Sequence, residues 1–126
     1  MQEMKLEPIR AYLLKNKGTT EDQPFGPDAL VFKVMGKMYA LVAWEETPLR
    51  ITLKCNPDDA LALRDQYKAV QPGYYMNKRH WNTVTLDGSI PDAEIQEMVD
   101  DSYALVVKGL KKSLRQELET QQENER

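Results

Sequence analysis

Cysteine and histidine are nearly absent from this chain of 126 residues, which holds one of each, Cys55 and His80. A single thiol forms no internal disulfide, which fits a protein of the reducing cytoplasm. Zinc sites with soft ligands are not expected, because they need several cysteines or histidines. Cys55 also falls on the apolar side of a predicted strand, where a free thiol acts as a small hydrophobic group rather than as a nucleophile. We therefore expect neither an enzyme nor a metal or other cofactor.

Long apolar runs and glycine-rich motifs are missing too. No run approaches the roughly 18 apolar residues that span a bilayer, and the first eight residues lack the basic start and apolar core of a secretory signal. Phosphate loops, dinucleotide fingerprints and the Gly-Xaa-Ser-Xaa-Gly elbow do not occur. The length suits one domain with a single core. We expect a cytoplasmic monomer or small oligomer with no membrane contact.

A surplus of positive charge is the third absence. The net charge of −3 argues against indiscriminate binding to nucleic acid, which usually shows a basic balance. The charges are unevenly placed, because residues 29–86 carry eight Lys or Arg against five Asp or Glu, a local +3. A mildly basic centre between acidic ends is compatible with an anion-binding face, and it is equally compatible with chance.

Hydrophobic spacing predicts a helix near the start of the chain. Leu6, Ile9 and Leu13 recur on one helical face and predict a helix over residues 3–16. Residues 19–28 are rich in turn formers and are predicted to be a linker.

The centre of the chain is predicted to be mainly sheet. Gly36 and Lys37 form the predicted two-residue connection of a hairpin. Asn56 and Pro57 begin a short predicted helix, because Asn caps a first turn and Pro fits the first helical position. Residues 71–74 are predicted to be a turn. The predicted strands cover residues 30–35, 38–44, 49–55 and 81–86.

The last helix has the clearest pattern. From Ile95 to Leu114 apolar residues repeat at intervals of three and four, which predicts one helix of five turns. Residues 118–126 are predicted to be a disordered polar tail, so the domain is expected over 1–117. Helices packed on one face of an antiparallel sheet make an α+β fold.

The segment 76–83 holds two cations, the only histidine, one of the two tryptophans and two carboxamides. In one interpretation Trp81 packs in the core and the polar residues solvate the entrance of a strand. In the other, the donors hold an anion, and Trp81 with Tyr74 and Tyr75 offers flat surfaces for stacking bases. This candidate binding site consists of Asn77, Lys78, Arg79, His80, Trp81 and Asn82, extended by Arg50 and Lys54 on the solvated face of the strand at 49–55.

Several of these stretches resemble the MmcQ/YjbR-like family. The resemblance implies a CyaY-like fold, in which a twisted antiparallel sheet carries the N- and C-terminal helices on one face. It also implies DNA binding through a double-wing arrangement, with Asn77 to Asn82 as the matching motif and Phe25, Gly26, Lys33 and Lys54 as secondary signatures. The matching stretches are Pro24–Asp28, Val31–Val34, Gly36–Met38, Trp44–Glu45, Leu53–Cys55, Pro72–Tyr74, Met76–Thr83 and Ser102–Tyr103.

Our hypothesis from the sequence is a non-enzymatic cytoplasmic protein that contacts DNA phosphate through the 76–83 segment and adjacent strands. The alternative is a binding module for a small anionic ligand or a protein partner, with no nucleic-acid role. Frataxin-type proteins share the implied fold and use a first helix thick with carboxylates. Iron handling is not expected here, because the first helix offers only Glu3 and Glu7.

Overall fold

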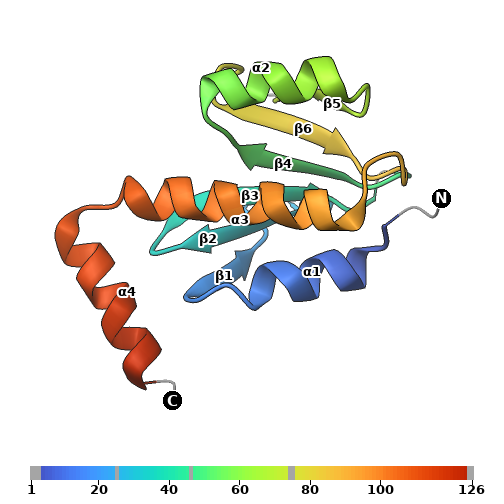
Figure 1. The fold of residues 1–126 in the computed structure, drawn as a ribbon. Coiled ribbons are helices and arrows are strands. Elements are labelled where there is room, and N and C mark those ends of the chain that lie inside the picture. Colours follow the sequence, from blue (N-terminus) through green and yellow to red (C-terminus); the bar gives the residue numbers. More distant parts are fainter. Residues whose placement is uncertain (1–3, 25, 46, 74–75, 125–126) are drawn as a thin grey trace.

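The structure, a computed structural model, describes residues 4–24, 26–45, 47–73 and 76–124. It confirms the α+β prediction, with an antiparallel sheet in the order β1-β2-β3-β4-β6-β5 and four helices (Figure 1). The strands are β1 (Thr19–Asp22), β2 (Ala29–Val34), β3 (Lys37–Ala43), β4 (Arg50–Lys54), β5 (Val70–Pro72) and β6 (Trp81–Thr85). The helices are α1 (Leu6–Leu14), α2 (Pro57–Gln66), α3 (Asp92–Lys108) and α4 (Lys112–Asn124).

The core lies between the sheet and the helices α1 and α3. Ile9 and Leu13 of α1 and Val99 of α3 are at most 1% exposed. They belong to one cluster with Phe32 and Ile51 of the sheet. The predicted packing of both terminal helices on one face is therefore confirmed. Apolar burial of this kind is the main favourable term in folding.

A second set of contacts fixes α3 on the sheet through polar groups. Ser102 is fully buried, and its hydroxyl donates to the carbonyl of Tyr39 at 2.6 Å and accepts from the backbone N–H of Lys54 at 2.8 Å. The ring of Tyr103 meets that of Tyr39 edge to face at 5.3 Å, and its hydroxyl donates to the carbonyl of Lys17. The Ser102–Tyr103 pair is thus a structural signature.

The first hairpin turns one residue earlier than predicted. Its central residues are Met35 and Gly36, which have φ angles of 49° and 80°, and Lys37 begins β3. A two-residue turn with positive φ at both positions matches the twist of the flanking strands. Glycine adopts such a φ at little cost, whichever central position it occupies, so the dipeptide alone did not settle the register.

The predicted linker at 19–28 is wrong for its first part. Residues 19–22 form the edge strand β1, in which Thr19 pairs with Val34, and Arg10 of α1 holds Glu21 in an ion pair. A short polar edge strand carries no hydrophobic alternation, and charge on such an edge discourages unwanted pairing. Phe25 lies outside the described residues.

The predicted turn at 71–74 is wrong in the same way. Residues 70–72 form the edge strand β5, which pairs with β6, and an edge position tolerates Pro72. Gly73 comes directly after β5 and lies close to β6, since its N–H donates to the carbonyl of Trp81 at 2.7 Å. A Cβ at this position would lie 2.7 Å from the Cβ of Trp81, so only glycine fits.

The predicted final helix is two helices. α3 ends at Lys108, Gly109 caps it, and α4 begins at Lys112 and turns away from the axis of α3 (Figure 1). The predicted disordered tail is wrong as far as residue 124, because this part is helical and Leu118 is 4% exposed in the core cluster. Glycine is a poor helix former, yet the apolar spacing continues across it and hid the break. None of the helices in the described ranges is long and apolar enough to cross a membrane.

Candidate functional site

The residues predicted to bind an anion are mostly gathered at one corner of the sheet. Residues 77–80 lead into β6, where Trp81 and Asn82 are the first two residues. Lys54 lies directly opposite Trp81 in the β4–β6 pairing. The backbone N–H of Cys55 donates to the carbonyl of His80 at 2.7 Å, which holds the loop against the end of β4.

Two of the predicted residues lie elsewhere. Arg50 is at the opposite end of β4, paired with Thr85, and the four residue steps from it to Lys54 correspond to about 13 Å of strand. Lys33 is on β2, three strand positions from β6, and its ammonium group pairs with Asp22 at 3.4 Å. Neither residue extends the surface formed by residues 77–82.

Asn82 has a structural role. Its side chain is 3% exposed, its oxygen accepts from Nε of Arg64 at 2.7 Å, and its amide group donates to the carbonyl of Ala60. Arg64 also donates to the carbonyls of Lys78 and Trp81. The carboxamide that was predicted to contact an anion therefore holds α2 against β6.

The remaining residues of the segment divide between structure and surface. The side-chain oxygen of Asn77 accepts from the backbone N–H of Arg79 at 2.9 Å and closes a local turn. Trp81 is half-buried. Lys78 and Arg79 are exposed. Tyr74 and Tyr75, the predicted stacking partners, lie outside the described residues. Lys54, Lys78 and Arg79, named below the basic corner, are the cations that could meet an anion.

The predicted solvated face of β4 is only partly solvated. Thr52 is 5% exposed, and its hydroxyl shares a hydrogen bond of 2.9 Å with that of Thr83 on β6. Val31, in the same cross-strand row of β2, is 1% exposed. The alternation of residues 49–55 indicated one open face, but the six-stranded sheet buries its centre on both sides.

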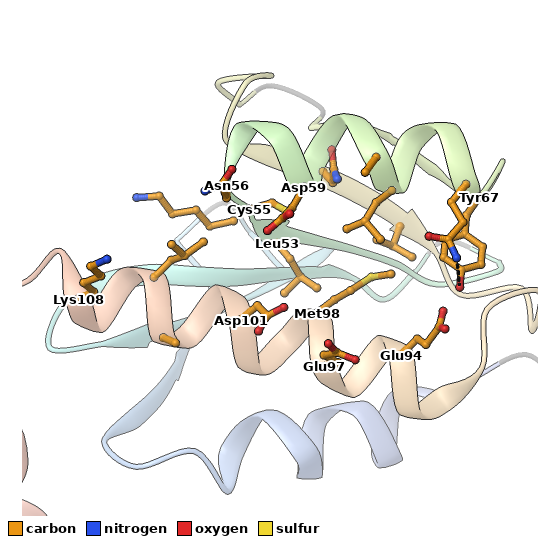
Figure 2. Close-up of a pocket in the computed structure, with 18 residues that line it drawn as sticks. Leu53, Cys55, Asn56, Asp59, Tyr67, Glu94, Glu97, Met98, Asp101 and Lys108 are labelled. Atoms are coloured by element: carbon orange, nitrogen blue, oxygen red, sulfur yellow. Dashed lines mark hydrogen bonds between the residues drawn. The ribbon is translucent and has the colours of Figure 1, made fainter.

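A concave site adjoins this corner, because Lys54 and Asn82 line it as well. A groove of about 610 Å³ runs between α2 and α3, above β4 and β6 (Figure 2). We name it the α2–α3 groove. Its apolar lining consists of Leu53 and Val84 from the sheet, Leu63 from α2, and Met98 and Leu105 from α3.

Four carboxylates, the groove carboxylates, border this apolar lining. Asp59 projects from α2 towards Asp101 on α3, and Glu97 and Glu94 continue the row along α3 (Figure 2). Burial raises the pKa of Asp101, and the charges of Glu97 and Asp59 raise it further. Lys108 lies at the opposite end of the groove from Glu94. Lys54 lines the groove as well. Four carboxylates against two lysines leave a net negative charge, which favours cations.

Cys55 lines the same groove. It is half-buried rather than in the core, and burial raises the pKa of its thiol to about 11, with the charges of Asp59 and Asp101 adding to the effect. The thiol is therefore protonated at neutral pH, which suppresses its reactivity. Within the described ranges, no group of three or more His, Cys, Asp or Glu is placed to hold a metal ion.

Sequence reasoning did not predict this groove. The one signal was the position of Glu94, Glu97 and Asp101 at helical spacing beside Met98 and Leu105, which puts acids and apolar residues on one face of α3. That face is recognisable as a binding surface only when α2 is known to stand opposite it.

Comparison with known proteins identifies the family of this molecule. A family model described as YjbR matches residues 14–105. The chain belongs to the YjbR family. It is 34% identical to Escherichia coli YjbR over 112 residues, which is 89% of this chain and 95% of YjbR. It is 39% identical to E. coli YbdF over 89 residues, 71% of this chain and 73% of YbdF. These relatives are described as uncharacterised proteins, so the likeness transfers a family and no activity.

Solved structures of similar proteins share the fold. A crystal structure of the Deinococcus radiodurans protein DR2400, described with the domain DUF419, superposes with a TM-score of 0.87 at 38% identity, covering 92% of this chain and 88% of DR2400. A crystal structure of a Pseudomonas syringae protein gives a TM-score of 0.70 at 32% identity, covering 81% of this chain and 98% of that protein. The family resemblance drawn from the sequence motifs is confirmed.

Proposed function

We propose that this YjbR-family protein is a non-catalytic binding module that holds a positively charged organic ligand in the α2–α3 groove. The observation that carries the proposal is the placement of Asp59 and Asp101 on opposing helices over an apolar lining. Such a site suits a ligand with both a cationic group and an apolar body. Binding sites of this size are usually apolar with a few converging polar groups.

The sign of the potential distinguishes this proposal from the anionic ligand expected from the sequence. Four carboxylates line the groove against two lysines, Lys54 and Lys108, which leaves an excess of negative charge. A cation relieves the mutual repulsion of Asp59 and Asp101, whereas a phosphate would add to it.

The absence of catalysis is proposed from the chemistry of the groove residues. Nucleophilic attack needs an activated thiol, hydroxyl or amine with a base in reach. Cys55 is protonated at neutral pH because burial and the charges of Asp59 and Asp101 raise its pKa to about 11. These features support retention of a ligand rather than its transformation.

Titration with n-hexylammonium, followed by amide chemical shifts, tests the proposal. We expect shifts at Leu53, Met98 and Asp101. The double variant Asp59→Asn with Asp101→Asn should weaken binding at least tenfold. A matched control, Asp65→Asn with Glu119→Gln, changes the net charge equally at exposed residues outside the groove, and it should bind as the parent does. Equal weakening in both double variants, or shifts confined to residues 76–83, would contradict the proposal.

DNA binding at the basic corner is a second candidate. The observation in its favour is that Lys78 and Arg79 are exposed and form no ion pair with the other described residues. The net charge and the neighbouring groove carboxylates oppose it. Phosphate contacts predict that affinity falls steeply with salt and that the slope decreases by about one for each cation removed.

A salt titration with mixed-sequence DNA separates the two candidates. Lys78→Ala with Arg79→Ala should lower both affinity and slope, whereas the control Lys111→Ala with Lys112→Ala, also exposed, should not. No binding at about 50 mM salt, where phosphate contacts are strongest, would exclude the DNA function.

A further inference from the structure

We infer that the ligand of the α2–α3 groove is a linear polyamine, a slender chain of two or three ammonium groups joined by short methylene spacers. The inference rests on the proposed function and specifies its ligand. Three features of the groove carry it: the spacing of the groove carboxylates, the apolar side chains between them, and the volume.

The carboxylates on α3 have a regular spacing. Glu94, Glu97 and Asp101 follow one another at intervals of three and four residues on the face that lines the groove. With a rise of about 1.5 Å per residue, Glu94 and Asp101 lie about 10.5 Å apart along the helix axis. An extended triamine with spacers of three and four methylenes spans about 11 Å between its end nitrogens, given bond lengths near 1.5 Å. Its ammonium groups can therefore follow the row.

The side chains between the carboxylates suit methylene spacers. Met98 lies between Glu97 and Asp101 in sequence, and in the groove it approaches Leu53 at the base (Figure 2). Leu63 lines the same space from α2. A ligand that alternates charged nitrogens with short apolar links matches this pattern better than a compact inorganic cation, which would leave the apolar lining in contact with water.

The volume favours a slender ligand over a bulky one. The lining of α3 runs from Glu94 to Lys108, about 21 Å, and a helix of that length with a diameter of about 10 Å occupies roughly 1,600 Å³. The groove offers about 610 Å³. A docked helix would lie only partly within this space, while a single methylene chain fits entirely.

Lys108 limits the ligand at one end. It lines the groove beyond Asp101, on the far side from Glu94. Its positive charge repels a further ammonium group there. The ligand is therefore expected to occupy the part of the groove between Glu94 and Asp101, with its terminal nitrogens near those two residues.

The test compares three amines by calorimetry at about 150 mM salt, where exposed charges are largely screened. The triamine N-(3-aminopropyl)butane-1,4-diamine should bind at least tenfold more tightly than butane-1,4-diamine. The diamine in turn should bind more tightly than n-butylamine. Glu94→Gln, which removes the end of the carboxylate row, should weaken the triamine severalfold and leave n-butylamine unchanged. The control Asp65→Asn should change neither affinity.

Cys55 provides a second measurement of binding that does not rely on calorimetry. It is the only cysteine of the chain and lines the groove, so its reaction with a thiol reagent reports occupancy of that site. Saturating triamine should slow labelling at least fivefold, and in the Asp59→Asn, Asp101→Asn variant it should not.

The possible results separate the two proposals. If n-hexylammonium binds in the groove as tightly as the triamine, or if a lysine-rich peptide binds more tightly, the polyamine inference is overturned and the proposed function stands. If no amine binds or protects Cys55, both are overturned. If the triamine binds equally well to the variants, it is held by the overall charge of the protein and the inference also fails.

Discussion

At the scale of single residues, the polar side chains of the family motifs mostly serve the fold. Ser102 bonds two strands from a helix, and Asn82 bonds α2 from a strand. Both are buried, and a buried polar group is tolerated only when its hydrogen bonds are made. A specific requirement of this kind produces a recognisable motif as readily as ligand binding does.

Replacement of Ser102 tests this role directly. Ser102→Ala removes the hydroxyl that bonds the N–H of Lys54 and the carbonyl of Tyr39. We expect a loss of about 1–3 kcal/mol in the free energy of unfolding, the usual cost of unsatisfied buried groups. The control Ser113→Ala is exposed and should stay within about 0.5 kcal/mol. Equal stability of the two variants in denaturant titrations would refute the role.

Asp101 gives a prediction about pH. Burial and the nearby acids raise its pKa in the folded state, so the folded state binds this proton more tightly than the unfolded state does. The contribution of Asp101 to the stability is then greatest below its unfolded pKa, near 4. This contribution falls as the pH rises through the higher folded pKa.

Asp101→Asn should accordingly stabilise the protein at pH 7. The gain should not exceed about 1 kcal/mol, because the residue is largely exposed, and it should vanish below about pH 4. Thermal unfolding of both proteins across pH 3–8 measures it, with Asp65→Asn as the control. A variant that is less stable than the parent at pH 7 would count against the assigned repulsion.

At the scale of secondary-structure elements, α2 is attached to the sheet mainly through Arg64. Its guanidinium group meets Asn82 and the carbonyls of Lys78 and Trp81, while Ala60 is the only fully buried side chain of the helix. Because α2 forms one wall of the α2–α3 groove, this polar attachment also sets the width of the groove. The loop before β6 and the groove are therefore linked through one side chain.

Arg64→Met is the matching experiment. It keeps an unbranched apolar side chain and removes the donors, so Asn82 loses its strongest partner, and we expect a destabilisation of about 1–3 kcal/mol. Hydrogen exchange in α2 should accelerate more than in α3. Arg115→Met, on exposed α4, is the control. Uniform acceleration across all helices would show that α2 has no special dependence on Arg64.

At the scale of the whole molecule, the domain includes α4. Leu118 is 4% exposed and belongs to the core cluster, so the chain contributes to the core well past the end of α3. The charged side chains are also distributed unevenly over the molecule. The basic corner and the acidic groove adjoin each other, because Lys54 belongs to both, so the net charge of −3 describes neither surface.

Leu118→Ala measures the contribution of α4. Truncation of a buried leucine usually costs about 2–5 kcal/mol, and we expect a value at the lower end for a site on a terminal helix. Leu61→Ala is the control, since Leu61 is 62% exposed on α2, and it should change stability by less than about 0.5 kcal/mol. If the two variants unfold at the same denaturant concentration, α4 does not belong to the cooperative domain.

Prediction from the sequence succeeded where the signal was local. The helix at Asn56–Pro57 was predicted because an Asn cap and a first-position Pro act within one turn, and the structure shows Asn56 accepting from the N–H of Asp58. Prediction failed for the polar edge strands at 19–22 and 70–72, because their pairing partners lie elsewhere in the chain. It failed again at Gly109, where apolar spacing continued across two helices.

The sequence by itself determined the family, through the resemblance of its motifs. It also determined the α+β class and the segments that form most of the core, because hydrophobic period and turn chemistry are properties of neighbouring residues. Only the tertiary structure decided what the polar residues do. Asn82 became a support of α2 because Arg64 stands beside it. Asp59 and Asp101, 42 positions apart, became one acidic site because two helices lie across the same strands. Electrostatic and hydrogen-bond roles depend on distances in space, and one amino-acid sequence does not give these distances.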